Sequence, residues 1–160
     1  MYGSYAAPMQ EIIIQFKFRG ITLPAAQFAQ LLYRQFQKQL ESLGAELVIP
    51  MPLHPSRERF RGYNQAAVFA HQLAGLLDLP VRGDIIFRIK KRKPQAKLKL
   101  KKRAKNIKGA FAVFQDAQEE IKVILVDDVV TSGATAMEAR KVLQRAGYNV
   151  VAVVSIAHGQ

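Results

Sequence analysis

An unbroken aliphatic run that ends in two adjacent carboxylates is the feature that most limits how this chain can fold. Val123 to Val126 has the composition of a strand buried on both faces, and Asp127 and Asp128 follow it directly. Small residues come next, and apolar residues then recur at helical spacing until Gly147, a residue that commonly ends helices. The sequence therefore predicts a strand, a tight turn and a helix, with both acids at the strand end.

The turn between this strand and this helix has the composition of an anion site. Backbone N–H groups and the positive end of a helix meet there, and a phosphate is the expected anion. A sugar phosphate suits the whole stretch, because its hydroxyls donate to the two acids while the turn binds its phosphate. The turn residues expected to do so are Thr131, Ser132, Gly133 and Thr135.

Other interpretations of this stretch are simpler. A Ser or Thr before a helix often only caps it, and an Asp pair at a strand end also occurs in response-regulator receivers. A receiver carries its pair on the first strand, whereas this pair lies near the C-terminal end of the sequence. A Walker P-loop is excluded because no Lys follows Gly133.

Composition limits the remaining classes of protein. The 160 residues, 49% of them hydrophobic, suit one globular domain over residues 1–160. Cysteine is absent, and His54, His71 and His158 are too scattered to indicate a metal cluster. No apolar run approaches the roughly 20 residues of a membrane span, and the first residues lack the pattern of a signal peptide. We expect a cytoplasmic protein without membrane insertion, which would reach the inner face of the membrane only through partners.

The net charge of +12 is concentrated in one segment. Between Arg82 and Lys108 there are 13 Lys or Arg residues and a single acid, Asp84, so this segment alone carries +12. The rest of the chain has 11 positive and 11 negative residues and sums to zero. Such a segment is too charged to pack, and we expect a basic flexible loop over residues 88–109.

The rest of the chain alternates between helical and strand patterns. The predicted helices are a short one carrying Met9, Ile13 and Phe16 up to Gly20, a longer one carrying Phe28, Leu32, Phe36, Leu40 and Leu43, and one from Asn64 to Leu77, so that residues 1–45 form an N-terminal helical part. The further predicted strands are Glu46 to Ile49, Ile85 to Ile89, Ala110 to Phe114 and Asn149 to Ile156.

This alternation predicts an α/β fold with a mainly parallel twisted sheet and helices on both faces. Ligands bind such sheets at the carboxyl ends of strands, so the loops after Ile49 and Val126 are expected to share a crevice. The first of these loops contains Pro50, Pro52 and Pro55, and we expect it to lack regular structure.

Two motifs carry a resemblance to a known family. The segment VILVDDVVTSGAT resembles the phosphoribosyl-pyrophosphate (PRPP) motif of type I phosphoribosyltransferases. The run PMPLHPSRERFRGYNQA, followed by spaced Gln95, Arg103 and Asn106 and by GAF from Gly109, resembles the ComF family of competence-associated, phosphoribosyltransferase-like proteins, from about Tyr2 onward. Proteins of the ComF type commonly begin with a small cysteine zinc ribbon. This chain starts about where that module would end, so the ribbon is expected to be absent or removed, and zinc is not carried over.

The resemblance implies a PRPP-binding protein associated with DNA uptake in natural competence. In this family's chemistry, a nitrogen nucleophile displaces pyrophosphate from C1 of the ribose with the help of Mg²⁺, and the acceptor here is unknown. Asp127 and Asp128 would be the catalytic pair, holding the ribose hydroxyls and bearing indirectly on Mg²⁺. Transferases for 6-oxopurines have an Asp at the position of Thr131, so a hypoxanthine or guanine enzyme is not expected. The implied 5′-phosphate residues are Thr131, Ser132, Gly133, Ala134 and Thr135, and the implied pyrophosphate residues are His54, Arg57 and Arg61.

The basic segment exceeds what PRPP and Mg²⁺ need. A single-stranded DNA is one expected partner, bound without sequence preference, and competence or DNA-uptake proteins are another. Only Phe87 and Phe111 lie near its flanks, so base stacking is expected to be weak. An acidic protein partner, a merely solvated loop, closure over the leaving group and an RNA-binding role stay open. The alternative function is therefore a non-catalytic module that binds single-stranded DNA or a partner through residues 82–108, with Lys97, Lys99, Lys101, Lys102 and Arg103 as the polyanion-binding residues.

Overall fold

A computed structural model describes residues 23–90 and 107–158. Most of the basic flexible loop expected over residues 88–109 falls outside these residues. Two further expectations fall outside them entirely. One is the short helix before Gly20, and the other is the set of polyanion-binding residues, Lys97, Lys99, Lys101, Lys102 and Arg103.

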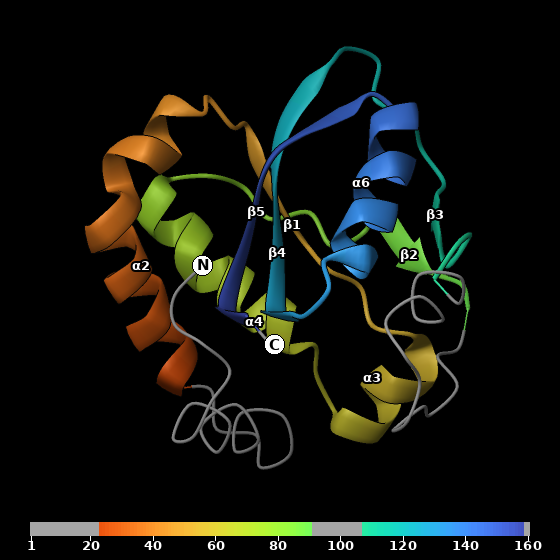
Figure 1. The fold of residues 1–160 in the computed structure, drawn as a ribbon, viewed down its shortest axis with the longest axis horizontal. Coiled ribbons are helices and arrows are strands. Elements are labelled where there is room, and N and C mark those ends of the chain that lie inside the picture. Colours follow the sequence, from red (N-terminus) through yellow and green to blue (C-terminus); the bar gives the residue numbers. More distant parts are fainter. Residues whose placement is uncertain (1–22, 91–106, 159–160) are drawn as a thin grey trace.

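A parallel sheet forms the centre of the described structure (Figure 1). Its strands are β1 (Leu47–Pro50), β4 (Ile121–Val130) and β5 (Tyr148–His158), in the order β1-β4-β5. Both pairings are parallel, as the alternating sequence pattern predicts. The middle strand β4 contains the aliphatic run, and Val123 to Val126 is fully buried. This middle position explains why the run is apolar at every residue.

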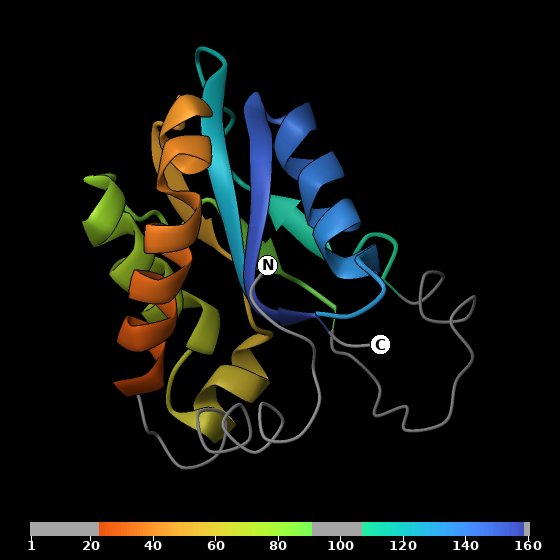
Figure 2. The same ribbon diagram turned by 60° about the vertical axis from the view of Figure 1, so that its left-hand side comes forward.

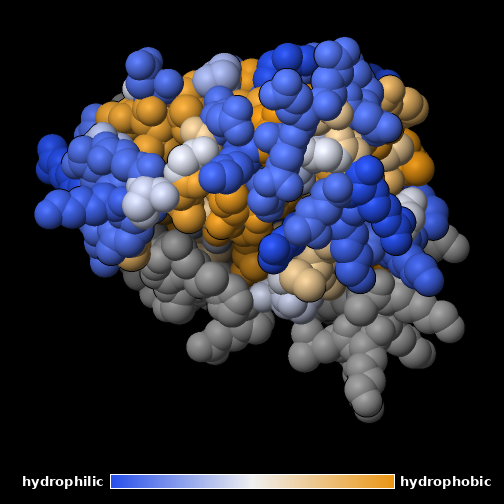
Figure 3. Space-filling view, turned by 90° about the horizontal axis from the view of Figure 1, so that it is seen from above, coloured by the Kyte–Doolittle hydropathy of each residue, from blue (hydrophilic) through white to orange (hydrophobic). Residues whose placement is uncertain are grey.

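Helices cover both faces of this sheet (Figures 1 and 2). On one face lie α2 (Leu23–Ser42) and α4 (Gln65–Leu77), which agree with the helices predicted there. On the other face lies α6 (Ala134–Arg145). Seen from above, apolar side chains lie between outer groups of hydrophilic ones (Figure 3).

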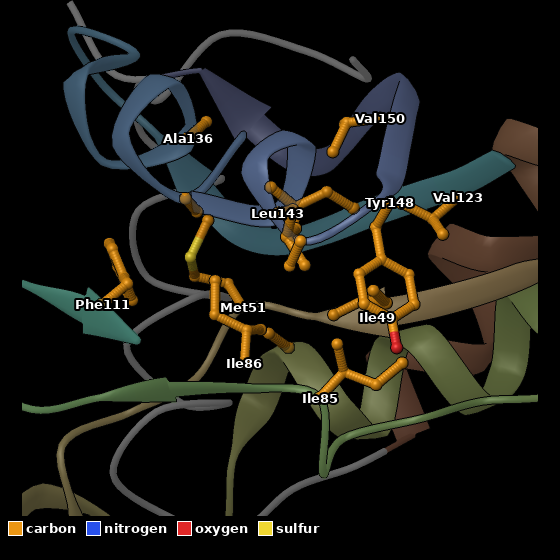
Figure 4. Close-up of a cluster of buried hydrophobic side chains, with 14 of the residues drawn as sticks. Ile49, Met51, Ile85, Ile86, Phe111, Val123, Ala136, Leu143, Tyr148 and Val150 are labelled. Carbon is orange, nitrogen blue, oxygen red and sulfur yellow. The ribbon is translucent and has the colours of Figure 1, made fainter. Parts of the chain in front are cut away.

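Alternate residues of the sheet strands supply the two hydrophobic cores. Ile124 and Val126 pack in the core beneath α2 and α4, together with Phe69. Val123 and Leu125 pack in the other core, beneath α6, where Figure 4 shows Leu143 of α6 and Val150 of β5. Because side chains alternate between the two faces of β4, this one strand contributes to both cores.

The other two predicted strands form a separate ribbon rather than joining the main sheet. The strands β2 (Ile86–Arg88) and β3 (Phe111–Val113) pair antiparallel, with Ile86 opposite Val113 and Phe87 opposite Ala112. The inward face packs Ile86 and Phe111 against the core beneath α6, whereas Phe87 is exposed. Apolar burial on one face only suits an antiparallel ribbon at the periphery.

A short helix lies where the prolines led us to expect irregular structure. The helix α3 (Pro55–Arg61) begins with Pro55 in its first turn, where a missing N–H costs nothing. His54 caps it by accepting a hydrogen bond from Ser56 N, and Gly62 ends it with φ of 80°. The expectation for this loop was therefore wrong, because a proline at a helix start favours the helix that it would break further along.

The N-terminal end of β4 is tied to the residue before β1 by reciprocal hydrogen bonds. Glu46 N donates to Lys122 O at 2.8 Å, and Lys122 N donates to the Glu46 carboxylate at 2.9 Å. Just beyond, an irregularity in the pairing with β5 shifts the register between Val123 and Ile124. Both features fix β4 at the end far from its carboxylates.

No helix within the described residues is both long and apolar enough to cross a membrane.

Candidate functional site

A pocket of about 260 Å³ lies at the carboxyl ends of β1 and β4. The helix α3 and the start of α6 lie at the same end of the molecule (Figure 1). Residues from the loops after both strands line the pocket, among them Met51, Pro52, Asp127 and Asp128. The expected shared crevice is therefore present, and its volume suits a small ligand rather than a polymer.

The two carboxylates enter this pocket from the last part of β4. Both side chains are half-buried. Asp128 N donates to Asp127 Oδ1 at 2.9 Å, and Val129 N donates to Asp128 Oδ1 at 2.8 Å, so neighbouring backbone groups orient both side chains. The strand continues to Val130 rather than turning at once after the pair, because β5 extends alongside and pairs with it as far as His158.

The turn after β4 leads into α6 through a glycine. Gly133 occupies the N-cap position with φ of 72°, a backbone conformation that other residues rarely adopt. Because the cap is a glycine, the interpretation of Thr131 and Ser132 as simple N-caps is wrong. Thr131, Gly133 and Thr135 line the pocket, whereas Ser132 and Ala134 do not appear in its lining.

Two of the three arginines in α3 reach the pocket. Arg57 and Arg61 are four residues apart and therefore lie on one face of the helix. Both are half-buried, and Arg61 Nη1 donates to Gln65 Oε1 at 3.0 Å. Arg59 is exposed, so the interpretation as a solvated charged turn fits Arg59 alone.

His54 lies at the start of α3 and does not line the pocket. Its Nδ1 accepts from Ser56 N at 3.2 Å and is 2.9 Å from Ser56 Oγ. The structure thus gives His54 a helix-capping position, and its part in binding pyrophosphate stays a prediction.

Three polar residues of the pocket lining were not predicted as site residues from the sequence. Gln65 is only 1% exposed and holds Arg61, and Asn64 Nδ2 donates to Met51 O at 3.0 Å. Arg88 enters from β2 with its guanidinium carbon 5.5 Å from the centre of the Phe111 ring. A single cation within the apolar run Ile85 to Ile89 was the available signal for Arg88.

The charges of the described lining residues suit an anion with hydroxyl groups. Three arginines, Arg57, Arg61 and Arg88, face two carboxylates, a difference of one positive charge. Among the described residues no cluster of three or more His, Cys, Asp or Glu side chains could hold a metal ion. Two carboxylates suit Mg²⁺, which usually binds one or two carboxylates and takes its other ligands from substrate phosphates and water.

Asn64 connects the start of α4 to the loop after β1. Its side-chain oxygen accepts from Ala66 N at 3.0 Å and caps α4, while its amide nitrogen binds Met51 O in the loop after β1. Asn64→Ala is expected to lower the free energy of unfolding by about 1–2 kcal/mol, measured by urea denaturation. Asn64→Asp keeps the cap but loses the donor to Met51 O. Its free energy of unfolding should therefore lie between those of the unmodified chain and Asn64→Ala. Equal stability of all three proteins would contradict this assignment.

Hydrogen bonds join the two ends of the segment between β2 and β3 to each other and to α6. Lys90 Nζ donates to Lys108 O at 2.9 Å, and Gly109 N donates to Glu138 Oε1 of α6 at 2.7 Å. Arg82 forms two hydrogen bonds to Asp84, at 2.7 and 2.9 Å. The hydrogen bond from Arg82 holds the pKa of Asp84 below its ordinary value and keeps this pair charged. Arg82 is therefore neutralised locally, and the excess charge lies beyond it.

Two solved adenine phosphoribosyltransferases share this architecture. Adenine phosphoribosyltransferase from Saccharomyces cerevisiae superposes with a TM-score of 0.51 at 14% identity, over 89% of this chain and 71% of that one. The enzyme from Thermoanaerobacter pseudethanolicus gives 0.50 at 14% identity, over 82% and 66%. The fold is that of the type I phosphoribosyltransferases.

Sequence comparison identifies the family within this fold. Competence protein F of Haemophilus influenzae is 36% identical over 97% of this chain and 70% of its own length. DNA utilization protein YhgH of Salmonella typhimurium is 31% identical over 94% and 67%, and competence protein ComFC of Bacillus subtilis is 33% identical over 90% and 57%. No protein-family model matches the chain. The chain belongs to the ComF family of competence and DNA utilization proteins.

Proposed function

We propose that this protein binds PRPP in the pocket at the ends of β1 and β4. The observation that carries the proposal is the meeting of three kinds of group in one small pocket: adjacent carboxylates, a glycine turn at a helix start and the arginines of α3. PRPP presents vicinal hydroxyls, a terminal phosphate and a pyrophosphate, which match these groups in turn.

Each part of PRPP has a partner of suitable chemistry in the pocket. Asp127 and Asp128 accept hydrogen bonds from the ribose hydroxyls. The turn from Thr131 to Thr135 offers hydroxyls and backbone N–H groups at the positive end of α6 to the 5′-phosphate. Arg57 and Arg61 bind the pyrophosphate, a ligand that arginine contacts with paired donors. These contacts position the ribose and stabilise the leaving group, which is most of what phosphoribosyl transfer requires of a protein.

Magnesium would enter with PRPP. When bound, it neutralises the pyrophosphate charge that develops as the bond to ribose C1 breaks. Asp127 and Asp128 are the described residues that would hold it, through water or the ribose hydroxyls.

Calorimetry with PRPP and Mg²⁺ tests the proposal directly. A saturable heat at one ligand per chain is the expected result. The absence of such a heat under conditions where the protein is folded would contradict it. A screen of pyrophosphate release across nucleobases and amines would then identify the acceptor.

The concentration of charge between Arg82 and Lys108 favours a second function, binding of single-stranded DNA. The pocket is too small for a polymer, so the DNA would bind outside it. We expect the logarithm of the affinity to fall by about 0.7 per log unit of salt for each phosphate contacted. Replacing Lys99, Lys101, Lys102 and Arg103 with Ser should reduce both the affinity and this slope. Binding that is unchanged in that variant would refute a role for the segment.

A further inference from the structure

The outward face of the β2–β3 ribbon carries exposed apolar side chains. Side chains alternate along each strand, so Phe87 and Ile89 lie on the face opposite to Ile86 and Arg88. Phe114, directly after β3, lies on this outward face as well. Their exposed fractions are 38% for Phe87, 54% for Ile89 and 74% for Phe114. Within the described residues, seven large apolar side chains are exposed, and these three lie together on one ribbon.

Phe87 and Phe114 are in contact with each other. Their ring centres are 5.1 Å apart and the ring planes are inclined at 57°. The expectation of weak base stacking counted Phe111, which is buried, and overlooked Phe114, which is the most exposed of the ribbon's aromatic residues. An exposed aromatic pair therefore lies on the ribbon, with Phe87 before and Phe114 after the stretch that connects β2 to β3.

The positive charge near this aromatic pair indicates which kind of partner would bind to it. Residues 89–110, which connect the two ribbon strands, hold 11 Lys or Arg residues and no acid. Lys90 and Lys108, at the base of this segment, are exposed and linked to each other through Lys108 O. An apolar partner alone would leave this charge unmatched. Aromatic surface beside closely spaced cations is the combination that binds bases and phosphates of a single strand.

We propose that Phe87 and Phe114 form a base-stacking platform for single-stranded DNA, with Ile89 extending its apolar surface. The inference rests on the second proposed function and assigns it a recognition surface among the described residues. Stacking would add affinity without sequence preference, because every base has an aromatic face. Arg88, on the opposite face of β2, lines the pocket, so the platform and the pocket are separate surfaces of one ribbon.

The test is the affinity of a labelled short oligothymidine, measured by fluorescence anisotropy, beside an abasic oligomer with the same number of phosphates. Phe87→Ala with Phe114→Ala should weaken oligothymidine binding by roughly 5- to 150-fold if one base stacks there. Affinity for the abasic oligomer should stay unchanged. Phe114→Tyr retains a ring and should retain the affinity of the unmodified chain.

The matched control is Phe60→Ala, which removes an 82% exposed phenyl ring from α3 and should leave both affinities unchanged. An equal loss in the control, or an equal loss for both oligomers, would overturn the stacking proposal. So would an unchanged affinity together with a shift from dimer to monomer in light scattering, since the pair would then belong to a contact between copies. If replacing Lys99, Lys101, Lys102 and Arg103 with Ser lowers the affinity and the aromatic variant does not, the stacking proposal is refuted. The proposal that the basic segment binds single-stranded DNA then stands. If the unmodified chain binds neither oligomer, the second function fails as well.

Discussion

Replacing Asp127 and Asp128 with Asn together is expected to abolish measurable PRPP binding in the presence of Mg²⁺. Each carboxylate that accepts hydrogen bonds from a ligand contributes about 1.5–3 kcal/mol, so losing both charges should lower the affinity at least a hundredfold. The fold should survive, because Asn retains the side-chain oxygen that accepts from Asp128 N or Val129 N. Calorimetry measures the affinity, and circular dichroism verifies the fold.

The control for this experiment removes the same charge elsewhere. Asp116 and Glu119 are exposed and outside the pocket lining, so Asp116→Asn with Glu119→Gln should bind PRPP like the unmodified chain. Heats that do not differ between the Asp127/Asp128 variant and this control would show that the carboxylates are not part of a PRPP site. A loss in both variants would indicate that net charge, rather than the pocket, governs the binding.

Phe69→Ala is expected to have the largest effect on stability, lowering the free energy of unfolding by roughly 3–5 kcal/mol. Phe69 lies in α4, has no exposed surface and packs in the core between α2, α4 and the sheet. Removing its ring leaves a cavity between elements that are held in place by the sheet. Urea denaturation measures the loss, which is a large share of the stability of a typical domain.

Phe60 again provides the matched comparison, since the same substitution removes a largely exposed ring. Phe60→Ala should change the stability by no more than about 0.5 kcal/mol. If the two variants lost similar stability, the burial of Phe69 would not be the cause, and the arrangement of α2 on α4 would need revision.

The sheet was predictable because its signals are local and repeated. The aliphatic run at Val123 to Val126 and its counterpart before Ile156 indicate buried strands whatever surrounds them. The two-stranded ribbon was only half predictable. Its strands were expected, but their pairing with each other depends on the ends of the basic segment meeting, as Lys90 and Lys108 do.

The part of the candidate site that comes from a single sequence motif was predictable. Asp127, Asp128 and Thr131 are neighbours in the sequence, and the structure places all three in the pocket lining. Gln65 and Arg88 were missed because their place in the pocket depends on how α4 and β2 pack, which no local pattern expresses. The roles of all these residues stay predictions until ligand binding is measured.

The position of α3 illustrates a different limit of sequence reasoning. Its prolines were interpreted as helix breakers, whereas Pro55 occupies the helix start. This difference matters for the site, because a helix presents Arg57 and Arg61 together whereas an irregular loop would not.

The register of β4 in the sheet determines where the carboxylates of Asp127 and Asp128 lie. The fully buried part of β4 is four residues long, Val123 to Val126, so sliding the strand by one residue would move Lys122 or Asp127 into a buried position. The same slip would exchange the faces of the sheet from which Asp127 and Asp128 project. The paired hydrogen bonds of Glu46 with Lys122 and the irregularity after Val123 oppose this slip from the far end of the strand. A substitution at Glu46, remote from the pocket, would therefore act on the alignment of its carboxylates.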